Sequence, residues 1–84
     1  MIISLQNCNV VITGGLRKMT REKAYALIKA EGGFPRKKVS SKTDYLIVSD
    51  DQMKSRHYTE KELVAEHLDI PIMSESIFYD IVGA

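Results

Sequence analysis

The sequence predicts an α/β fold, a small three-layer sandwich in which a four-stranded parallel sheet is flanked by three helices. Two short runs, Val10–Ile12 and Tyr45–Val48, are continuously apolar, which is typical of strands buried on both faces of a parallel sheet. Helical patterns alternate with strand patterns along the chain, as right-handed crossovers between parallel strands require. The 84 residues contain no evident linker or repeat, so a single domain over residues 1–84 is expected.

The first half of the chain is expected to form a strand, a helix and a second strand. Thr20 is a suitable N-cap for a helix that runs to about Glu31, because apolar residues recur within it at the i, i+3, i+4 spacing of a buried stripe. Pro35 and a basic triplet then lead into a short strand expected around Val39. Too few residues separate this strand from the one at Tyr45–Val48 for a crossover, so another strand should lie between them.

The second half begins with residues 49–57, which show no periodicity and are expected to form a mobile loop. Thr59 and Glu62 then fit a capping box at the start of a second helix. That helix is expected to end near Leu68. The fourth strand is predicted at Ile70–Met73, and the proline within it indicates a sheet edge, because proline cannot donate to the ladder.

A third helix is expected to follow Ser74, which is its predicted N-cap. Its apolar side should be formed by Ile77, Phe78, Ile81 and Val82. Phe34 and Tyr45, like Phe78, are expected to belong to the core and not to a base-stacking surface.

Positive charge is clustered along the chain, although the formal net charge is only +1. Basic residues gather at 17–23, at 36–38 and at 54–56. A nearly neutral chain does not coat nucleic acid through its bulk charge, so any nucleic-acid contact is expected to be local. The alternative is that these clusters are solvated surface charges.

Cys8 is the single cysteine, so no intramolecular disulfide can form and a reducing compartment is expected. That compartment would be the cytoplasm, with nucleoid association, in a bacterium, or the nucleus in a eukaryote. The sequence shows neither a transmembrane span nor a secretory signal. Membrane and extracellular roles are therefore disfavoured.

The order and spacing of several stretches resemble a BRCT domain, most closely the type at the C-terminus of bacterial NAD-dependent DNA ligases. The stretches that carry the resemblance are Val10–Gly14, Met19–Ala24, Ile28, Gly32–Gly33, Val39–Val48, Ile70–Ile72, Ser74–Glu75 and Phe78. The resemblance implies the strand order 2-1-3-4, which places the first strand between the second and third. The resemblance thus accounts for the short second connection.

The resemblance also implies a phosphate site. Phosphate-binding members hold the anion with a hydroxyl and the adjacent glycine amide after the first strand, and with a lysine early in the second helix. The matching residues are Thr13, Gly14 and Lys61, with Thr59 as a supporting hydroxyl. A cation, a hydroxyl and an unhindered amide are what phosphate requires. The alternative is a strand-ending turn, a simple N-cap and a solvated lysine.

Nearby basic residues are candidates for contacts with a nucleic-acid backbone. These residues are Arg17, Lys18, Arg21, Lys54 and Arg56. The triplet Arg36–Lys38 is expected at the opposite strand end, as solvated surface. Two functions are compatible with these residues. The first is a non-catalytic module of DNA replication or repair that binds a 5′-phosphorylated DNA end or nick. The alternative is an adaptor that recruits a repair or replication protein, including by recognising a phosphopeptide.

Catalytic and metal-binding patterns are not found in the sequence. His57 and His67 lie ten residues apart, and zinc binding lacks the necessary number of ligands. The glycine pair after the first strand does not form a P-loop, and no dinucleotide fingerprint follows it. The chain is therefore expected to be no enzyme and to need no metal or cofactor.

Overall fold

Strands and helices alternate along the chain, as the sequence predicts. The computed structural model describes residues 3–84. The elements are β1 (Asn9–Thr13), α1 (Arg21–Ala30), β2 (Phe34–Arg36), β3 (Tyr45–Val48), α2 (Asp50–Met53), α3 (Glu60–His67), β4 (Ile72–Ser74) and α4 (Glu75–Val82). The strands form one parallel sheet in the order β2-β1-β3-β4, which confirms the predicted topology.

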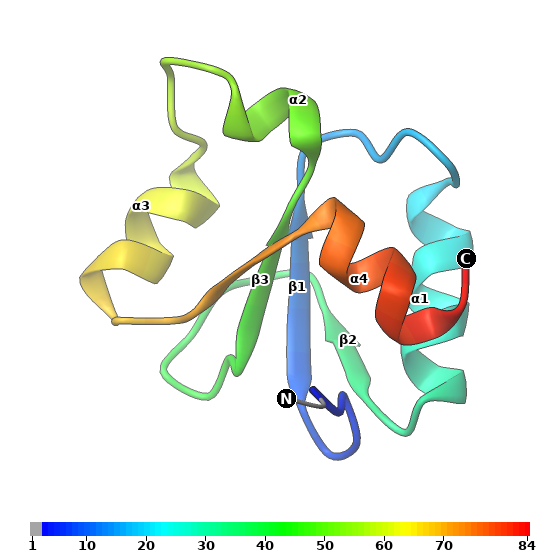
Figure 1. The fold of residues 1–84 in the computed structure, drawn as a ribbon. Coiled ribbons are helices and arrows are strands. Elements are labelled where there is room, and N and C mark those ends of the chain that lie inside the picture. Colours follow the sequence, from blue (N-terminus) through cyan, green and yellow to red (C-terminus); the bar gives the residue numbers. More distant parts are fainter. Residues whose placement is uncertain (1–2) are drawn as a thin grey trace.

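Helices cover both faces of this sheet, with α1 and α4 on one side and α3 on the other (Figure 1). The core under α1 and α4 is the larger of the two; among its buried residues are Val10, Ile12, Ile28, Ile47, Met73 and Phe78. The core under α3 consists of Val11, Leu46, Val48, Ala65 and Ile70. Successive strand residues point to opposite faces, and this alternation explains why two continuously apolar strands supply both cores.

The second strand lies earlier in the chain than expected. β2 comprises Phe34–Arg36, and Val39 is not in a strand. The Phe34 amide donates to the Cys8 carbonyl at 2.8 Å, and proline is tolerated in this strand because β2 is at the sheet edge. Val39 instead packs against the core under α3. Phe34 is 46% exposed, so its predicted place in the core is wrong.

The predicted loop at 49–57 contains a helix that the sequence analysis missed. Helix α2 begins after Ser49, whose hydroxyl accepts a hydrogen bond from the Gln52 amide. With only four residues, this helix is too short to show a periodic pattern. It follows β3 directly and lies beside the end of β1 (Figure 1).

The third helix of the prediction is α4, and it buries a different set of side chains. Ser74 is its N-cap and Phe78 is fully buried, as expected. However, Ile77 is 43% exposed, whereas Tyr79 and Glu75 are buried. The fourth strand also begins later than predicted, at Ile72.

Candidate functional site

The carboxyl end of β1 turns sharply at Gly14. This residue has φ +88°, and a Cβ atom there would lie 2.2 Å from the Ser49 hydroxyl oxygen. The Ser49 amide donates to the Thr13 carbonyl at 3.1 Å, which holds the two strand ends together. Gly14 is thus required by the backbone, because a side chain would collide and would strain the left-handed conformation. Within residues 3–84, the Gly14 amide has no protein acceptor.

Two threonine hydroxyls meet at this strand end. The Thr13 hydroxyl donates to the Thr59 hydroxyl oxygen at 3.0 Å. The same oxygen accepts the Glu62 amide at 3.1 Å, so both of its lone pairs are used. Thr13 is only 4% exposed, whereas Thr59 is half-buried. The hydroxyl hydrogen that can reach a ligand is therefore that of Thr59.

The start of α3 is fixed by the predicted capping box, which is present. Glu62 accepts the Thr59 amide at 3.1 Å and the Gln52 side-chain amide at 2.7 Å. The same Gln52 nitrogen donates to the His57 carbonyl at 2.7 Å. Helix α2 thereby stabilises the position of Thr59. The helix N-terminus adds partial positive charge at this point.

Lys61 lies in the first turn of α3, and its Nζ atom donates to the Ile12 carbonyl oxygen at 3.3 Å. The last residue of β2, Arg36, is paired with Val11, so the Ile12 carbonyl lies just beyond the ladder. Burial lowers the pKa of Lys61, and the nearby Arg21 guanidinium lowers it further. The structure thus brings Lys61 to the same strand end as the two threonines.

Arg21 is the second cation here, and its guanidinium donates to the Gly14 carbonyl at 3.0 Å. Within residues 3–84, neither Arg21 nor Lys61 forms an ion pair with a carboxylate. Arg17 differs, because its Nη2 atom lies 2.5 Å from Asp51 Oδ1. The hydrogen bond and charge of Arg17 hold the pKa of Asp51 below its usual value.

The remaining predicted backbone contacts are spread more widely. Lys18 lies over the Tyr79 ring, with Nζ 5.1 Å from the centroid. Lys54 is the C-cap of α2, and Arg56 follows in the loop before α3. All three side chains are exposed.

Sequence reasoning placed the basic triplet 36–38 at the opposite strand end, and this placement holds for Arg36 but is incomplete for the two lysines. Arg36 Nε donates to Asn9 Oδ1 at the start of β1 at 3.1 Å, and Lys37 and Lys38 line a hollow there together with Asn9. Lys37 and Lys38 also line the same hollow as Lys61. β2 runs parallel to β1 and is paired with it up to Arg36 and Val11, so the chain leaves β2 toward the carboxyl edge. Once β2 is placed at Phe34–Arg36, the parallel sheet alone predicts this result.

A buried carboxylate holds the loop between β1 and α1. Glu75 is fully buried and accepts the Arg17 amide at 2.6 Å and the Asp50 amide at 2.8 Å. It also accepts the Tyr79 hydroxyl. Burial alone would raise the pKa of Glu75, but these hydrogen bonds lower it below its usual value. Glu75 therefore connects α4 to both segments that flank the site.

Together these groups can bind an anion. Two unpaired cations, an available hydroxyl, a free amide and a helix N-terminus meet at the end of β1. Across residues 3–84, no three His, Cys, Asp or Glu side chains are placed to hold a metal ion. In the same range, no helix has the length and apolar character to cross a membrane.

Comparison with known proteins adds a family and several relatives. Residues 4–82 match the family described as "BRCA1 C Terminus (BRCT) domain". A DNA ligase of Roseiflexus castenholzii is 42% identical over 74 residues, 88% of this chain and 10% of that protein. A DNA ligase of Chlamydia caviae is 44% identical over 66 residues, 79% of the chain and 9% of that protein.

Replication factor C subunit 1 of Drosophila melanogaster is 37% identical over 78 residues, which make up 93% of this chain and 7% of that protein. The chain thus spans a tenth or less of the length of each of these relatives.

Proposed function

Because the chain belongs to the BRCT family, we propose that it is a non-catalytic module of DNA replication or repair that binds a 5′-phosphorylated DNA end or nick. The named relatives support a role in DNA replication or repair, since they are two DNA ligases and a subunit of replication factor C. Their shared segment is a tenth or less of their length. That fraction favours a module that binds over one that catalyses.

The observation that carries the proposal is the convergence of Lys61 and Arg21 at the end of β1 without a partner carboxylate. Two cations that lack a counter-ion, Lys61 half-buried and Arg21 exposed, favour an anion as ligand. A phosphate would be bound by these two side chains, by the Thr59 hydroxyl and by the Gly14 amide. Charge-assisted hydrogen bonds of this kind contribute about 1.5–3 kcal/mol each.

Thr13 has a supporting role in this arrangement. Its hydroxyl hydrogen is donated to Thr59, so it orients the hydroxyl that meets the ligand. A phosphate that binds here therefore contacts Thr59 directly and depends on Thr13 indirectly.

The DNA on either side of the phosphate would follow the exposed cations around the site. Lys18, Lys54 and Arg56 remain candidates, and Lys37 and Lys38 join them because they line the hollow beside Lys61. Arg17 would first have to leave Asp51. Each neutralised phosphate contributes about −0.9 to the slope of log K against log salt concentration for duplex DNA.

Fluorescence anisotropy tests the proposal with matched duplexes that carry a 5′-phosphate or a 5′-hydroxyl, at two salt concentrations. We expect the phosphorylated duplex to bind more tightly, and we expect Lys61→Ala to remove this preference with a loss of about tenfold to a hundredfold. Lys29→Ala is the control, since Lys29 is an exposed cation in the last turn of α1.

Equal binding of both duplexes by the parent chain would reject the proposal, as would a preference that survives Lys61→Ala. Affinity for DNA would then stay at the non-specific level of about 10⁻⁴–10⁻⁶ M. The adaptor function would then be favoured.

A further inference from the structure

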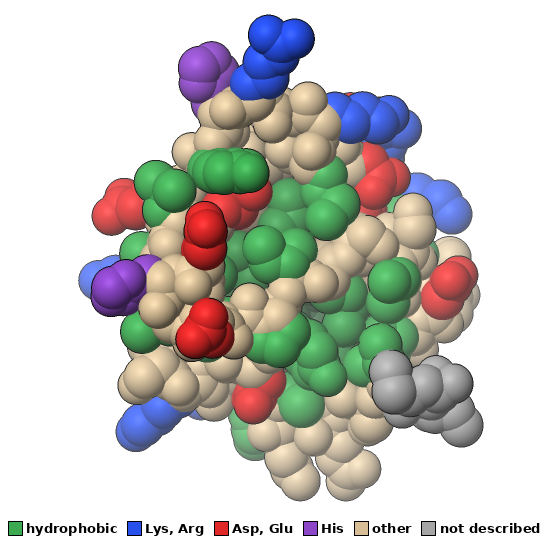
Figure 2. Space-filling view, turned by 60° about the vertical axis from the view of Figure 1, so that its left-hand side comes forward, with side chains coloured by type: hydrophobic (Ala, Val, Ile, Leu, Met, Phe, Trp, Pro, Cys, Tyr) green, Lys and Arg blue, Asp and Glu red, His purple; other side chains and the backbone are tan. Residues whose placement is uncertain are grey.

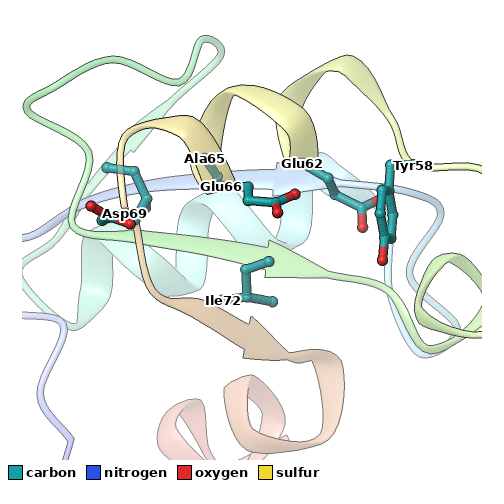
Figure 3. Close-up of a pocket in the computed structure, with 7 residues that line it drawn as sticks. Tyr58, Glu62, Ala65, Glu66, Asp69 and Ile72 are labelled. Atoms are coloured by element: carbon teal, nitrogen blue, oxygen red, sulfur yellow. The ribbon is translucent and has the colours of Figure 1, made fainter.

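A groove separate from the phosphate site lies between α3 and β4. Its volume is about 470 Å³, and Tyr58, Glu62, Glu66, Asp69 and Ile72 are among the residues that line it. Figure 3 shows Glu62 and Glu66 extending from α3 on one side and Ile72 from β4 on the other, with Tyr58 and Asp69 at the two ends. The floor is apolar, and the side formed by α3 is acidic.

The strand that borders this groove has an open edge. β4 is the outermost strand, next to β3 alone. The Pro71 carbonyl accepts the Leu46 amide from β3 at 3.0 Å, and backbone groups alternate in direction along a strand. The amide and carbonyl of Ile72 therefore face outward. Among residues 3–84, no strand pairs with this edge.

Apolar side chains at the groove are exposed to solvent. Tyr58 is 63% exposed and Ile72 is 46% exposed. Ile72 is in register with Leu46, which belongs to the core under α3, so its side chain lies on the α3 side of the sheet. Figure 2 shows hydrophobic side chains gathered in the middle of this face, with acidic side chains beside them and basic ones at its margin.

The charge of the groove specifies the partner. Glu66 and Asp69 are exposed, no Lys or Arg lines the groove, and within residues 3–84 neither carboxylate belongs to an ion pair. A strand added beside β4 would project alternate side chains toward α3. Long basic side chains suit this position, because their methylene groups can cover Ile72 while the charged ends reach the carboxylates.

We propose that the open edge of β4 and the groove beneath α3 bind an extended segment of a partner protein in which lysine or arginine alternates with apolar residues. The segment pairs its backbone with Ile72 and adds a fifth strand to the sheet. This site differs from the phosphate site in charge and in the sheet edge that it uses, and the two share only Glu62, which lines the groove and accepts the Thr59 amide.

Amide chemical-shift mapping tests the proposal with the ¹⁵N-labelled chain and a short capped peptide that alternates lysine and valine. We expect the amide signals of Ile72, Glu66 and Asp69 to shift and to saturate. Two control peptides are used: one replaces lysine by glutamate, and one keeps lysine but is N-methylated on alternate residues and cannot pair as a strand. Neither control should produce these shifts.

A charge-neutral variant tests the role of the carboxylates. Glu66→Gln with Asp69→Asn removes both charges, and asparagine tolerates the left-handed backbone at position 69, where φ is 57°. We expect affinity for the lysine peptide to fall about tenfold, in line with two lost charge-assisted contacts. The matched control is Glu31→Gln with Asp80→Asn, an exposed carboxylate at the C-cap of α1 and one on α4, and it should bind normally.

Four outcomes of the peptide titrations would overturn the proposal. They are no shifts at millimolar lysine peptide, equal shifts with either control peptide, shifts confined to residues 13–21, or undiminished binding by the Glu66 and Asp69 variant. A shift of Ile72 that depends on protein concentration without peptide would also overturn it, because a second copy of the chain would then occupy the edge.

Discussion

Helix α3 has a basic surface at its start and an acidic groove along its side, and the two are assembled differently. The basic surface joins distant parts of the chain: Lys61 contacts Ile12, Thr59 contacts Thr13, and Arg21 contacts the same strand end. The groove is built from one continuous stretch, residues 58–72. The net charge is only +1, although the chain carries two surfaces of opposite charge.

The difference underlies the two proposals, in which one small domain recognises two kinds of partner. Unpaired cations at a strand end favour an anion, and unpaired carboxylates beside an open strand favour a basic peptide. Because long-range contacts form the basic surface, substitutions far from Lys61 in the sequence should damage it. The groove should tolerate the same substitutions.

The largest effect is expected for Gly14→Ala. The added methyl group would meet Ser49 at 2.2 Å in a left-handed backbone, so we expect the free energy of unfolding to fall by about 3 kcal/mol. Gly15→Ala is the matched control, because nothing lies within 4 Å of its Cβ position. Urea unfolding measures both, and an equal cost at the two positions would contradict this account of the turn.

Glu75→Gln is expected to cost about 2 kcal/mol at neutral pH, because at least one buried donor loses its acceptor. The pKa of Glu75 is lowered in the folded state. Its charge therefore stabilises the fold fully at any pH above its usual pKa of about 4.5. This stabilisation is lost as the pH falls through the lowered pKa. The stability difference between parent and variant should therefore shrink in acid. A difference that does not change with pH would refute the role of the charged carboxylate.

Lys61→Met is expected to separate binding from stability. The lowered pKa of Lys61 means that burial disfavours its charge, so at neutral pH the charge costs folding free energy. This cost decreases as the pH rises from the lowered pKa to the usual value of 10.5. Methionine keeps the apolar length of the side chain without the charge. We expect an unchanged or higher urea midpoint together with loss of phosphate preference. A lower midpoint would show that Lys61 has a structural role.

The smallest effect is expected for Arg17→Gln, whose guanidinium is already paired with Asp51. We expect its affinity for the phosphorylated duplex to change less than that of Arg21→Gln, which loses a cation without a carboxylate partner. Anisotropy with both variants under identical salt measures the difference. If Arg17→Gln had the larger effect, Arg17 would have to leave Asp51 when DNA binds.

Local signals were sufficient to predict most of the fold. Continuous apolar runs identified β1 and β3, and capping residues such as Thr20, Thr59 and Ser74 located the starts of the long helices. β2 was misplaced because Phe34 and Arg36 are exposed and a proline lies between them, so no buried pattern marks this edge strand. Helix α2 was missed because Ser49 and contacts from Gln52 define it, rather than periodicity.

For the candidate site, the sequence predicted which residues belong to it but not how they are hydrogen-bonded. The resemblance to the BRCT family selected Thr13, Gly14, Thr59 and Lys61, and the structure places them at one strand end. The sequence could not reveal that Thr13 donates its hydroxyl hydrogen to Thr59. Arg17 is paired with Asp51, which lies in the helix α2 that the sequence did not predict. This pairing could therefore not be predicted either. The groove escaped notice because an open strand edge is a property of the sheet.

The central claim is tested most directly by mapping amide shifts of the ¹⁵N-labelled chain with a 5′-phosphorylated duplex and with the same duplex carrying a 5′-hydroxyl. The account predicts that the difference between the two titrations is concentrated at Gly14, Arg21, Thr59 and Lys61 and does not appear at the groove residues Glu66 and Ile72. Indistinguishable titrations, or a difference centred on the groove, would contradict it.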